Sequence, residues 1–249
     1  MPSPDAPPPV PDEDAFAPFD LVAIDLDGTL ADTVADLHAA TVRMQEGLGL
    51  ERAPLEAVRG WVGNGVERLV HRALTGAMER DAPPDLFAAA LPRFLVAYEA
   101  CNGTAATLYP GVERGLERLA ALGTPLACVT NKAGRFSRPL LEALGIAGRF
   151  AYHVAGDDVP AKKPDPAALH EAARLAGVAP SSSVLVGDSV SDIRAARAAS
   201  FGIVAVSYGY NHGRPVRRLR GAERPDAVVD SLEELPELFA RLEGRGRAD

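Results

Sequence analysis

Short runs of consecutive apolar residues alternate with helix-length amphipathic stretches along most of the chain. Apolar residues that follow one another without alternation are typical of strands buried on both faces of a sheet. Strands that alternate with helices favour a parallel sheet with helices on both of its faces. The candidate strands are residues 21–24, 126–129, 184–186, 203–206 and 227–229, with a weaker run at 150–154. The candidate helices between them are residues 111–122, 137–144, 166–176 and 192–199.

One long interval, residues 32–107, contains helical patterns and no convincing strand. Apolar residues recur there at steps of three and four, which places them on one stripe of each helix. Because the interval follows the first candidate strand directly, we predict a helical domain at 32–107 inserted into a sheet domain of residues 19–31 and 108–249. Pro92 falls within the last helical pattern and is expected to kink or split that helix.

The first 18 residues are rich in proline and acidic side chains. Such a composition cannot bury enough apolar surface to offset the entropy lost on ordering, so we predict a disordered tail over residues 1–18. This segment lacks the features of a secretory signal, and the chain offers no run of ~20 apolar residues for a membrane-spanning helix. Two cysteines, Cys101 and Cys128, show no disulfide or metal-finger spacing. We therefore expect a cytoplasmic protein with free thiols.

The charge balance limits the partners of this chain. It has 26 basic and 34 acidic residues, a net charge of -8. That sign disfavours a surface for nucleic-acid phosphates or anionic lipids, so we expect neither nucleic acid nor membrane as a partner. The arginine-rich run at residues 214–220 is interpreted as a solvated surface rather than a polyanion site. The sequence does not distinguish a monomer from a homodimer.

Polar residues follow three of the candidate strands at the point where each strand ends. In an open parallel sheet the ligand crevice forms at these carboxyl ends, so we expect the polar side chains to meet on one rim. A lysine directly before a proline precedes the third of these strands. The residues concerned are Asp25 and Asp27, Thr130 and Asn131, Lys163, and Asp188 and Asp192.

The aspartates on this rim would repel one another unless a cation balanced them. Ligands that are all oxygen, beside a bound phosphate, suit Mg²⁺, which keeps several waters and takes only one or two carboxylates. By its spacing, Asp188 can bind this metal. Asp192, four residues later, can support the metal or orient Lys163.

The remaining residues suggest phosphoryl-transfer chemistry. Asp25 and Asp27 are two apart at the end of an extended segment, so both can point into one pocket, and Gly28 lets the backbone turn sharply out of the strand. One carboxylate can attack phosphorus while the other exchanges protons, which divides a difficult hydrolysis into two displacements. Thr130 and nearby backbone amides can hold phosphoryl oxygens, and Lys163 can offset the negative charge of the transition state.

In this order, the motifs resemble the four motifs of the haloacid dehalogenase-like hydrolase superfamily. They are residues 25–30 (DLDGTL), 130–131 (TN), 163–164 (KP) and 187–192 (GDSVSD), and the resemblance extends from about Phe19 to Leu238. It implies an α/β fold, with a Rossmann-like parallel sheet flanked by helices and an inserted all-helical cap domain. The interval without strands corresponds to that cap.

The resemblance also implies a role for each motif residue. Asp25 would be the nucleophile and Asp27 the general acid and base, with Mg²⁺ as the cofactor. Thr130, with Asn131, and Lys163 would bind the phosphoryl group. The implied metal ligands are Asp25, Asp27 through its backbone carbonyl, Asp188 and Asp192.

Four further segments resemble bacterial phosphoglycolate phosphatases; they are residues 61–67, 156–158, 162–166 and 208–211. This resemblance implies a magnesium-dependent phosphomonoesterase that hydrolyses 2-phosphoglycolate to glycolate and phosphate through an aspartyl-phosphate intermediate. One alternative is a phosphatase or phosphomutase that acts on another small phosphorylated metabolite, such as a sugar phosphate or pyrophosphate. The other is a non-catalytic binding protein on the same fold.

Substrate selectivity is expected to come from the helical insert, because the motif residues contact only the phosphoryl group. Gly63, Asn64 and Gly65 precede a candidate helix whose free N-terminal amides suit a carboxylate. We therefore interpret these three residues as candidates for substrate specificity. Arg68, one turn further along, is a candidate for an additional positive charge or for a solvated side chain.

Overall fold

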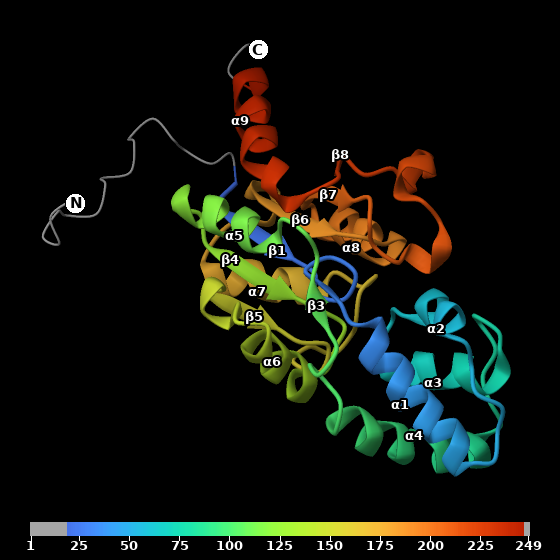
Figure 1. The fold of residues 1–249 in the computed structure, drawn as a ribbon. Helices are drawn as coiled ribbons and strands as arrows, with labels where there is room; N and C mark the ends of the chain where they lie inside the picture. Colours follow the sequence, from blue (N-terminus) through green and yellow to red (C-terminus); the bar gives the residue numbers. More distant parts are fainter. Residues whose placement is uncertain (1–18, 247–249) are drawn as a thin grey trace, which may run out of the picture.

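A six-stranded parallel sheet forms the centre of the molecule (Figure 1), with the strand order β5-β4-β1-β6-β7-β8. The computed structural model describes residues 19–246, so the predicted tail at residues 1–18 lies outside the described residues. The strands are β1 Leu21–Ile24, β4 Leu126–Val129, β5 Tyr152–Val154, β6 Ser183–Gly187, β7 Gly202–Val206 and β8 Ala227–Val229. All six apolar runs identified in the sequence form strands of this sheet.

The strands are apolar throughout because helices cover both faces of the sheet (Figure 1). In β1, Leu21 and Ala23 pack with helices α7 and α8, whereas Val22 and Ile24 pack with α5, α6 and α9. The helices are α5 Val112–Ala121, α6 Gly134–Ala143, α7 Ala167–Ala176, α8 Val190–Ala199 and α9 Leu235–Gly246. The predicted α/β class, a parallel sheet flanked by helices, is confirmed. Across residues 19–246, none of the helices combines the length and apolarity needed to cross a bilayer.

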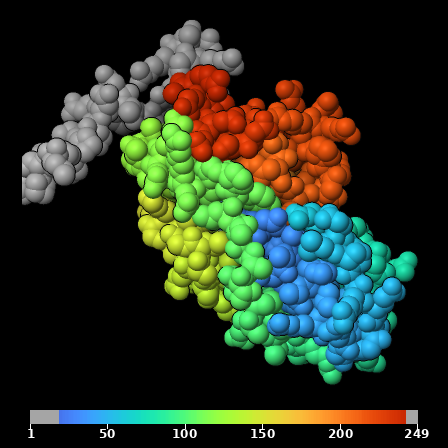
Figure 2. Space-filling view, viewed as in Figure 1, coloured from blue at the N-terminus to red at the C-terminus, as the bar shows by residue number. Residues whose placement is uncertain are grey.

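Four helices lie together beside the sheet, at the lower right of Figures 1 and 2. These cap helices are α1 Val34–Gly47, α2 Leu55–Trp61, α3 Val66–Thr75 and α4 Pro84–Glu99. They form an apolar cluster of their own, in which Met44, Val70 and Phe94 are fully buried. Helix α4 continues through Pro92 instead of splitting there. Pro92 is exposed, so water can satisfy the carbonyl that the proline leaves without a helical partner.

The chain crosses between the sheet and the cap helices through a short antiparallel pair, β2 Ala31–Asp32 and β3 Thr107–Leu108. Asp36, in the first turn of α1, holds residues 103–106, which lead back to the sheet, against the start of the cap. Its buried carboxylate accepts hydrogen bonds from the backbone N–H groups of Gly103 at 2.8 Å, Ala105 at 2.9 Å and Ala106 at 3.2 Å. One side chain therefore sets where the cap begins and ends.

We predict that Asp36→Ala lowers the free energy of unfolding by about 3 kcal/mol, because it leaves several buried backbone donors without an acceptor. Urea unfolding measures this change. Asp85→Ala is the matched control, since Asp85 also lies in the first turn of a cap helix but is exposed. Its loss should stay within about 0.5 kcal/mol. Equal losses in the two variants would contradict the role given to Asp36.

Candidate active site

One cavity lies at the carboxyl ends of the central strands, between the sheet and the cap helices. Its lining comes from the loops after β1, β4, β5, β6 and β7 on the sheet side and includes the segment before α3 on the cap side. Such a position is where parallel sheets bind their ligands. All the candidate site residues from the sequence line it: Asp25, Asp27, Gly63, Asn64, Gly65, Thr130, Asn131, Lys163, Asp188 and Asp192.

Lys163 ties the polar groups of this cavity together. Its Nζ lies 2.9 Å from Oδ1 of Asp25 and 2.7 Å from Oδ1 of Asp192, and it donates to the Val129 carbonyl at 3.0 Å. Burial lowers the pKa of Lys163, but the Asp192 and Asp25 carboxylates outweigh burial, and the net shift is upward. The upward shift of its pKa favours the charged ammonium form of the buried Lys163.

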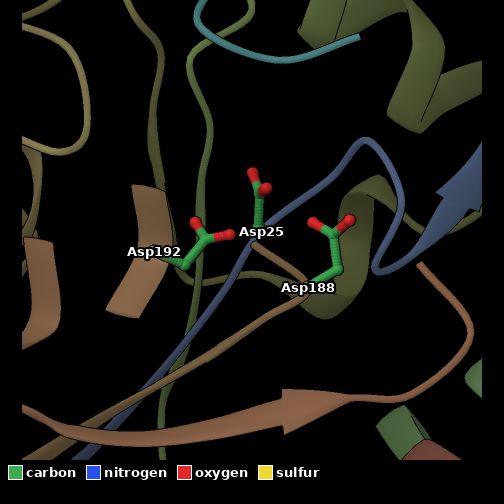
Figure 3. A group of neighbouring side chains, drawn as sticks. All are labelled: Asp25, Asp188 and Asp192. Carbon is green, nitrogen blue, oxygen red and sulfur yellow. The ribbon is translucent and has the colours of Figure 1, made fainter. Parts of the chain in front are cut away.

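The carboxylates of Asp25, Asp188 and Asp192 converge (Figure 3), with one oxygen of each within 4.8 Å of the others. Burial raises the pKa of Asp25 to about 7, although Lys163 opposes the shift. Burial, with the neighbouring Asp192 and Asp25, also raises the pKa of Asp188. Three buried carboxylates exceed the charge of one ammonium, so the cluster favours a further cation. Its donors are all oxygen atoms, which fits a hard divalent ion such as Mg²⁺.

The loop after β7 holds Asp188 in place. Oδ2 of Asp188 accepts the backbone N–H groups of Tyr210 at 2.6 Å and Asn211 at 3.3 Å. A Cβ atom built on Gly28 would lie 2.6 Å from this oxygen, and one built on Gly209 would overlap with the Asp188 side chain. Gly28 also has a φ of 87°. Both positions therefore need glycine for the carboxylate to reach the cluster.

Asp192 has both of its oxygens engaged by protein groups. Oδ1 pairs with Lys163, and Oδ2 accepts the Ser189 backbone N–H at 3.1 Å and the Ser189 hydroxyl at 2.6 Å. Ser189 and Asp192 together form a capping box at the start of α8. Of the two interpretations made from spacing, orientation of Lys163 is thus a direct contact, while metal ligation by Asp192 stays a prediction.

Thr130 and Asn131 differ in whether the side chain keeps a hydrogen-bonding group available for a ligand. Oγ1 of Thr130 accepts the Lys132 backbone N–H at 3.1 Å, which leaves its hydroxyl hydrogen for a phosphoryl oxygen. The side-chain amide of Asn131 makes two hydrogen bonds to the backbone of Lys163. Its oxygen accepts the Lys163 N–H at 2.8 Å, and its nitrogen donates to the Lys163 carbonyl at 2.9 Å. A phosphoryl contact from Asn131 would therefore fall to its backbone N–H.

Lys132 is a site residue that the sequence interpretation did not assign. Its buried Nζ lies 2.9 Å from Oδ1 of Asp27 and donates to the Tyr98 hydroxyl of α4 at 2.7 Å. Thr33 donates to the same Asp27 oxygen at 2.6 Å. Asp27 is thus held by Lys132 from the sheet domain and by Thr33 from the start of the cap. Lys132 directly follows the polar pair at the end of β4, so the strand-end criterion could have found it.

The loop of residues 63–65 leads into α3 and approaches the cavity from the cap side. Its residues have positive φ angles of 119°, 64° and 87°. Arg72, which is almost fully buried, holds the loop by donating to the Gly63 carbonyl at 3.1 Å and to Oδ1 of Asn64 at 3.0 Å. The loop therefore keeps its shape through a guanidinium that the sequence interpretation did not select.

Two other charged features of the sequence lie apart from the cavity lining. Arg68 pairs with Asp81 at 2.7 Å, so its side chain is engaged outside the site. Within the arginine-rich run, Arg217 pairs with Asp230 at 2.7 Å, and both side chains are more than half exposed. The exposed Arg217 pair matches the solvated interpretation of the run, whereas Arg68 is a partly buried side chain that pairs away from the cavity lining.

The model of haloacid dehalogenase-like hydrolases matches residues 19–200, and the chain belongs to this family of hydrolases. Its relatives include two phosphoglycolate phosphatases. The protein of Nitrosococcus oceani is 47% identical over 222 residues, which cover 89% of this chain and 97% of the relative. The protein of Pseudomonas putida is 48% identical over 216 residues, which cover 86% of this chain and 78% of the relative. The crystal structure of a predicted phosphoglycolate phosphatase from Haemophilus somnus superimposes with a TM-score of 0.81 at 32% identity, covering 89% and 98%.

The raised pKa values of Asp25 and Asp188 predict how pH acts on the metal-free protein. The folded state keeps protons that the unfolded chain releases above about pH 4, so the free energy of unfolding falls from there to about pH 7. A bound divalent ion replaces those protons. Mg²⁺ should therefore raise the melting temperature more at about pH 8 than at about pH 5.5.

Asp188→Asn provides the control for this measurement, because it removes one of the acids while nearly preserving shape. Its melting temperature should respond weakly to Mg²⁺ at both pH values. An equal response of the original protein at the two pH values would contradict the assignment of the metal cluster.

Proposed function

We propose that the chain is a magnesium-dependent phosphatase that hydrolyses 2-phosphoglycolate to glycolate and phosphate. The observation that carries this proposal is the convergence of Asp25, Lys163 and Asp188 in one cavity beneath the cap loop. The relatives named phosphoglycolate phosphatase, at 47% and 48% identity over most of the chain, support the choice of substrate.

In the first displacement, an oxygen of Asp25 forms a bond to phosphorus while the bond from phosphorus to the glycolate oxygen breaks. Asp27 gives a proton to the departing oxygen. Lys163 pairs with Asp25 and offsets the charge of the transition state, and the Thr130 hydroxyl holds a phosphoryl oxygen. Lys132 and Thr33 keep Asp27 oriented towards the leaving group.

In the second displacement, water attacks the phosphorus of the aspartyl-phosphate and gives a proton to Asp27. The bond from Asp25 to phosphorus breaks, which releases phosphate, restores Asp25 as a carboxylate and leaves Asp27 protonated for the next cycle. Asp25, Asp188 and the backbone carbonyl of Asp27 would hold Mg²⁺, with support from Asp192. When bound, the ion supplies positive charge to the phosphoryl oxygens.

The cap supplies the selectivity in this proposal. Helix α3 has ten residues, and its first N–H groups lie next to the cavity at Gly65 and Val66. A helix N-terminus favours an anionic group, such as the carboxylate of a two-carbon acid. A hexose phosphate has no carboxylate for this position and needs more room beneath the loop.

We also propose a cytoplasmic location, as the composition suggested. Cys101 and Cys128 are both buried free thiols. A reducing compartment keeps thiols in that form, which supports the proposal.

Asp25→Asn should reduce turnover by several orders of magnitude, because the amide cannot attack phosphorus, and it should leave the fold intact. The measurement is phosphate release with Mg²⁺ present, together with a thermal melt. Asp20→Asn is the matched control, since Asp20 is exposed just before β1 and should keep full activity. Appreciable turnover in a folded Asp25→Asn protein would exclude the covalent route.

On a panel of phosphate esters, kcat/KM for 2-phosphoglycolate should exceed that for hexose phosphates by at least about tenfold. Gly65→Val should narrow this gap and affect an aryl phosphate less, because Gly65 has a φ of 87° and borders the cavity. Gly76→Val is the matched control, since Gly76 also has a positive φ and ends α3 away from the cavity lining. A preference for glucose phosphates would leave only the general phosphatase assignment.

A further inference from the structure

The cavity lining contains three side chains that can carry positive charge: Lys132, Lys163 and His212. Both lysines already pair with aspartates of the site. On the cap side, Arg68 is engaged by Asp81, and Arg72 by the loop that it holds. Among the described residues, His212 is therefore the lining group best placed to meet a negative charge on the substrate beyond its phosphoryl group.

His212 comes from the core, in the short turn Asn211–Gly213 after β7, and its ring reaches the cap loop. Its Nδ1 lies 3.0 Å from the Gly60 carbonyl oxygen. A Cβ atom built on Gly63 would lie 3.2 Å from Cε1 and 3.5 Å from Nε2 of the ring. Because Nδ1 faces a carbonyl oxygen, Nδ1 carries the hydrogen, which leaves Nε2 as the ring nitrogen for another partner.

The backbone that presents His212 is held in an unfavourable conformation. Asn211 has a φ of 33° and His212 a φ of 51°. Such angles in residues other than glycine persist only where surrounding contacts enforce them, and they concentrate at functional sites. The contacts here come from Asn211, which accepts the Val190 N–H at 3.0 Å, donates to the Arg214 carbonyl at 2.7 Å and donates to Asp188 at 3.3 Å. The turn is thus fixed to the metal cluster.

We propose that His212 is a specificity-determining residue that binds the carboxylate of the substrate through Nε2, beside the N-terminus of α3. The inference rests on the proposed function, because it names the group that recognises the acid end of phosphoglycolate. Burial lowers the pKa of His212, and a bound carboxylate acts in the opposite direction. In the protonated ring Nε2 donates a hydrogen bond to that carboxylate.

Two substitutions separate the two nitrogens of the ring. His212→Asn places an amide near the position of Nδ1, so it can keep the contact with Gly60, and asparagine tolerates a positive φ. His212→Gln places its amide near the position of Nε2. The substrates are 2-phosphoglycolate and 2-phosphoglycolamide, in which a neutral amide replaces the carboxylate. Steady-state kinetics give KM and kcat for each pair, and thermal melts check folding.

We expect His212→Asn to raise KM for 2-phosphoglycolate about tenfold and to change kcat by less than about twofold. Both constants for 2-phosphoglycolamide should stay unchanged. His212→Gln should retain part of the affinity, because its amide can donate to the carboxylate. Arg68→Gln, which alters a charge on the same cap outside the cavity lining, should leave both substrates unaffected.

Two other outcomes overturn the inference. If His212→Asn raises KM equally for both substrates, the ring only positions the cap loop. If the substitution changes KM for neither substrate, the carboxylate binds elsewhere. A wild-type enzyme that does not favour 2-phosphoglycolate over 2-phosphoglycolamide would overturn the proposed function itself, and this inference with it.

Discussion

A buried ammonium held between two carboxylates is the interaction on which the site depends. Lys163 is 2% exposed and pairs with both Asp25 and Asp192. Without it, three carboxylates would face one another in a poorly solvated cavity, and breaking such a buried pair typically costs about 3–5 kcal/mol. Asn131 fixes the backbone of the lysine, and the capping box of α8 fixes Asp192. The single positive charge of Lys163 therefore pairs both with Asp25, at the end of β1, and with Asp192, at the start of α8.

The cap and the acidic cluster are joined by the loop after β7. Tyr210 donates its backbone N–H to Asp188, and its hydroxyl accepts the Thr33 backbone N–H at 2.8 Å and donates to Asp32 at 2.8 Å. Thr33 immediately precedes α1 and also donates to Asp27. Tyr210 therefore contacts both regions: its backbone N–H holds the Asp188 carboxylate, and its hydroxyl bonds the segment where the cap begins. This tyrosine links the start of the cap directly to the acidic cluster.

The sheet could be predicted from the sequence because burial on two faces makes each strand apolar throughout. The candidate site at its edge could be predicted because the polar residues stand directly at the strand ends. Features that depend on partners distant in the sequence were missed. Lys132 was not assigned to the site, and its partner Tyr98 lies on a cap helix far away in the sequence. His212 carries no ligand spacing, and its contact with Gly60 appears only in three dimensions. The pair β2 and β3 is too short for any periodic pattern.

The position of β1 in the sheet has a consequence for the order in which the chain can assemble. Its two neighbours, β4 and β6, come much later in the sequence than the four cap helices. During synthesis both edges of β1 stay unpaired until those strands emerge, whereas the cap helices can pack against one another as soon as they are made. Asp25, the proposed nucleophile, is therefore synthesised well before Lys163, Asp188 and Asp192, which surround it in the folded protein. The residues of the four cap helices are therefore complete in the nascent chain before the candidate site can be assembled.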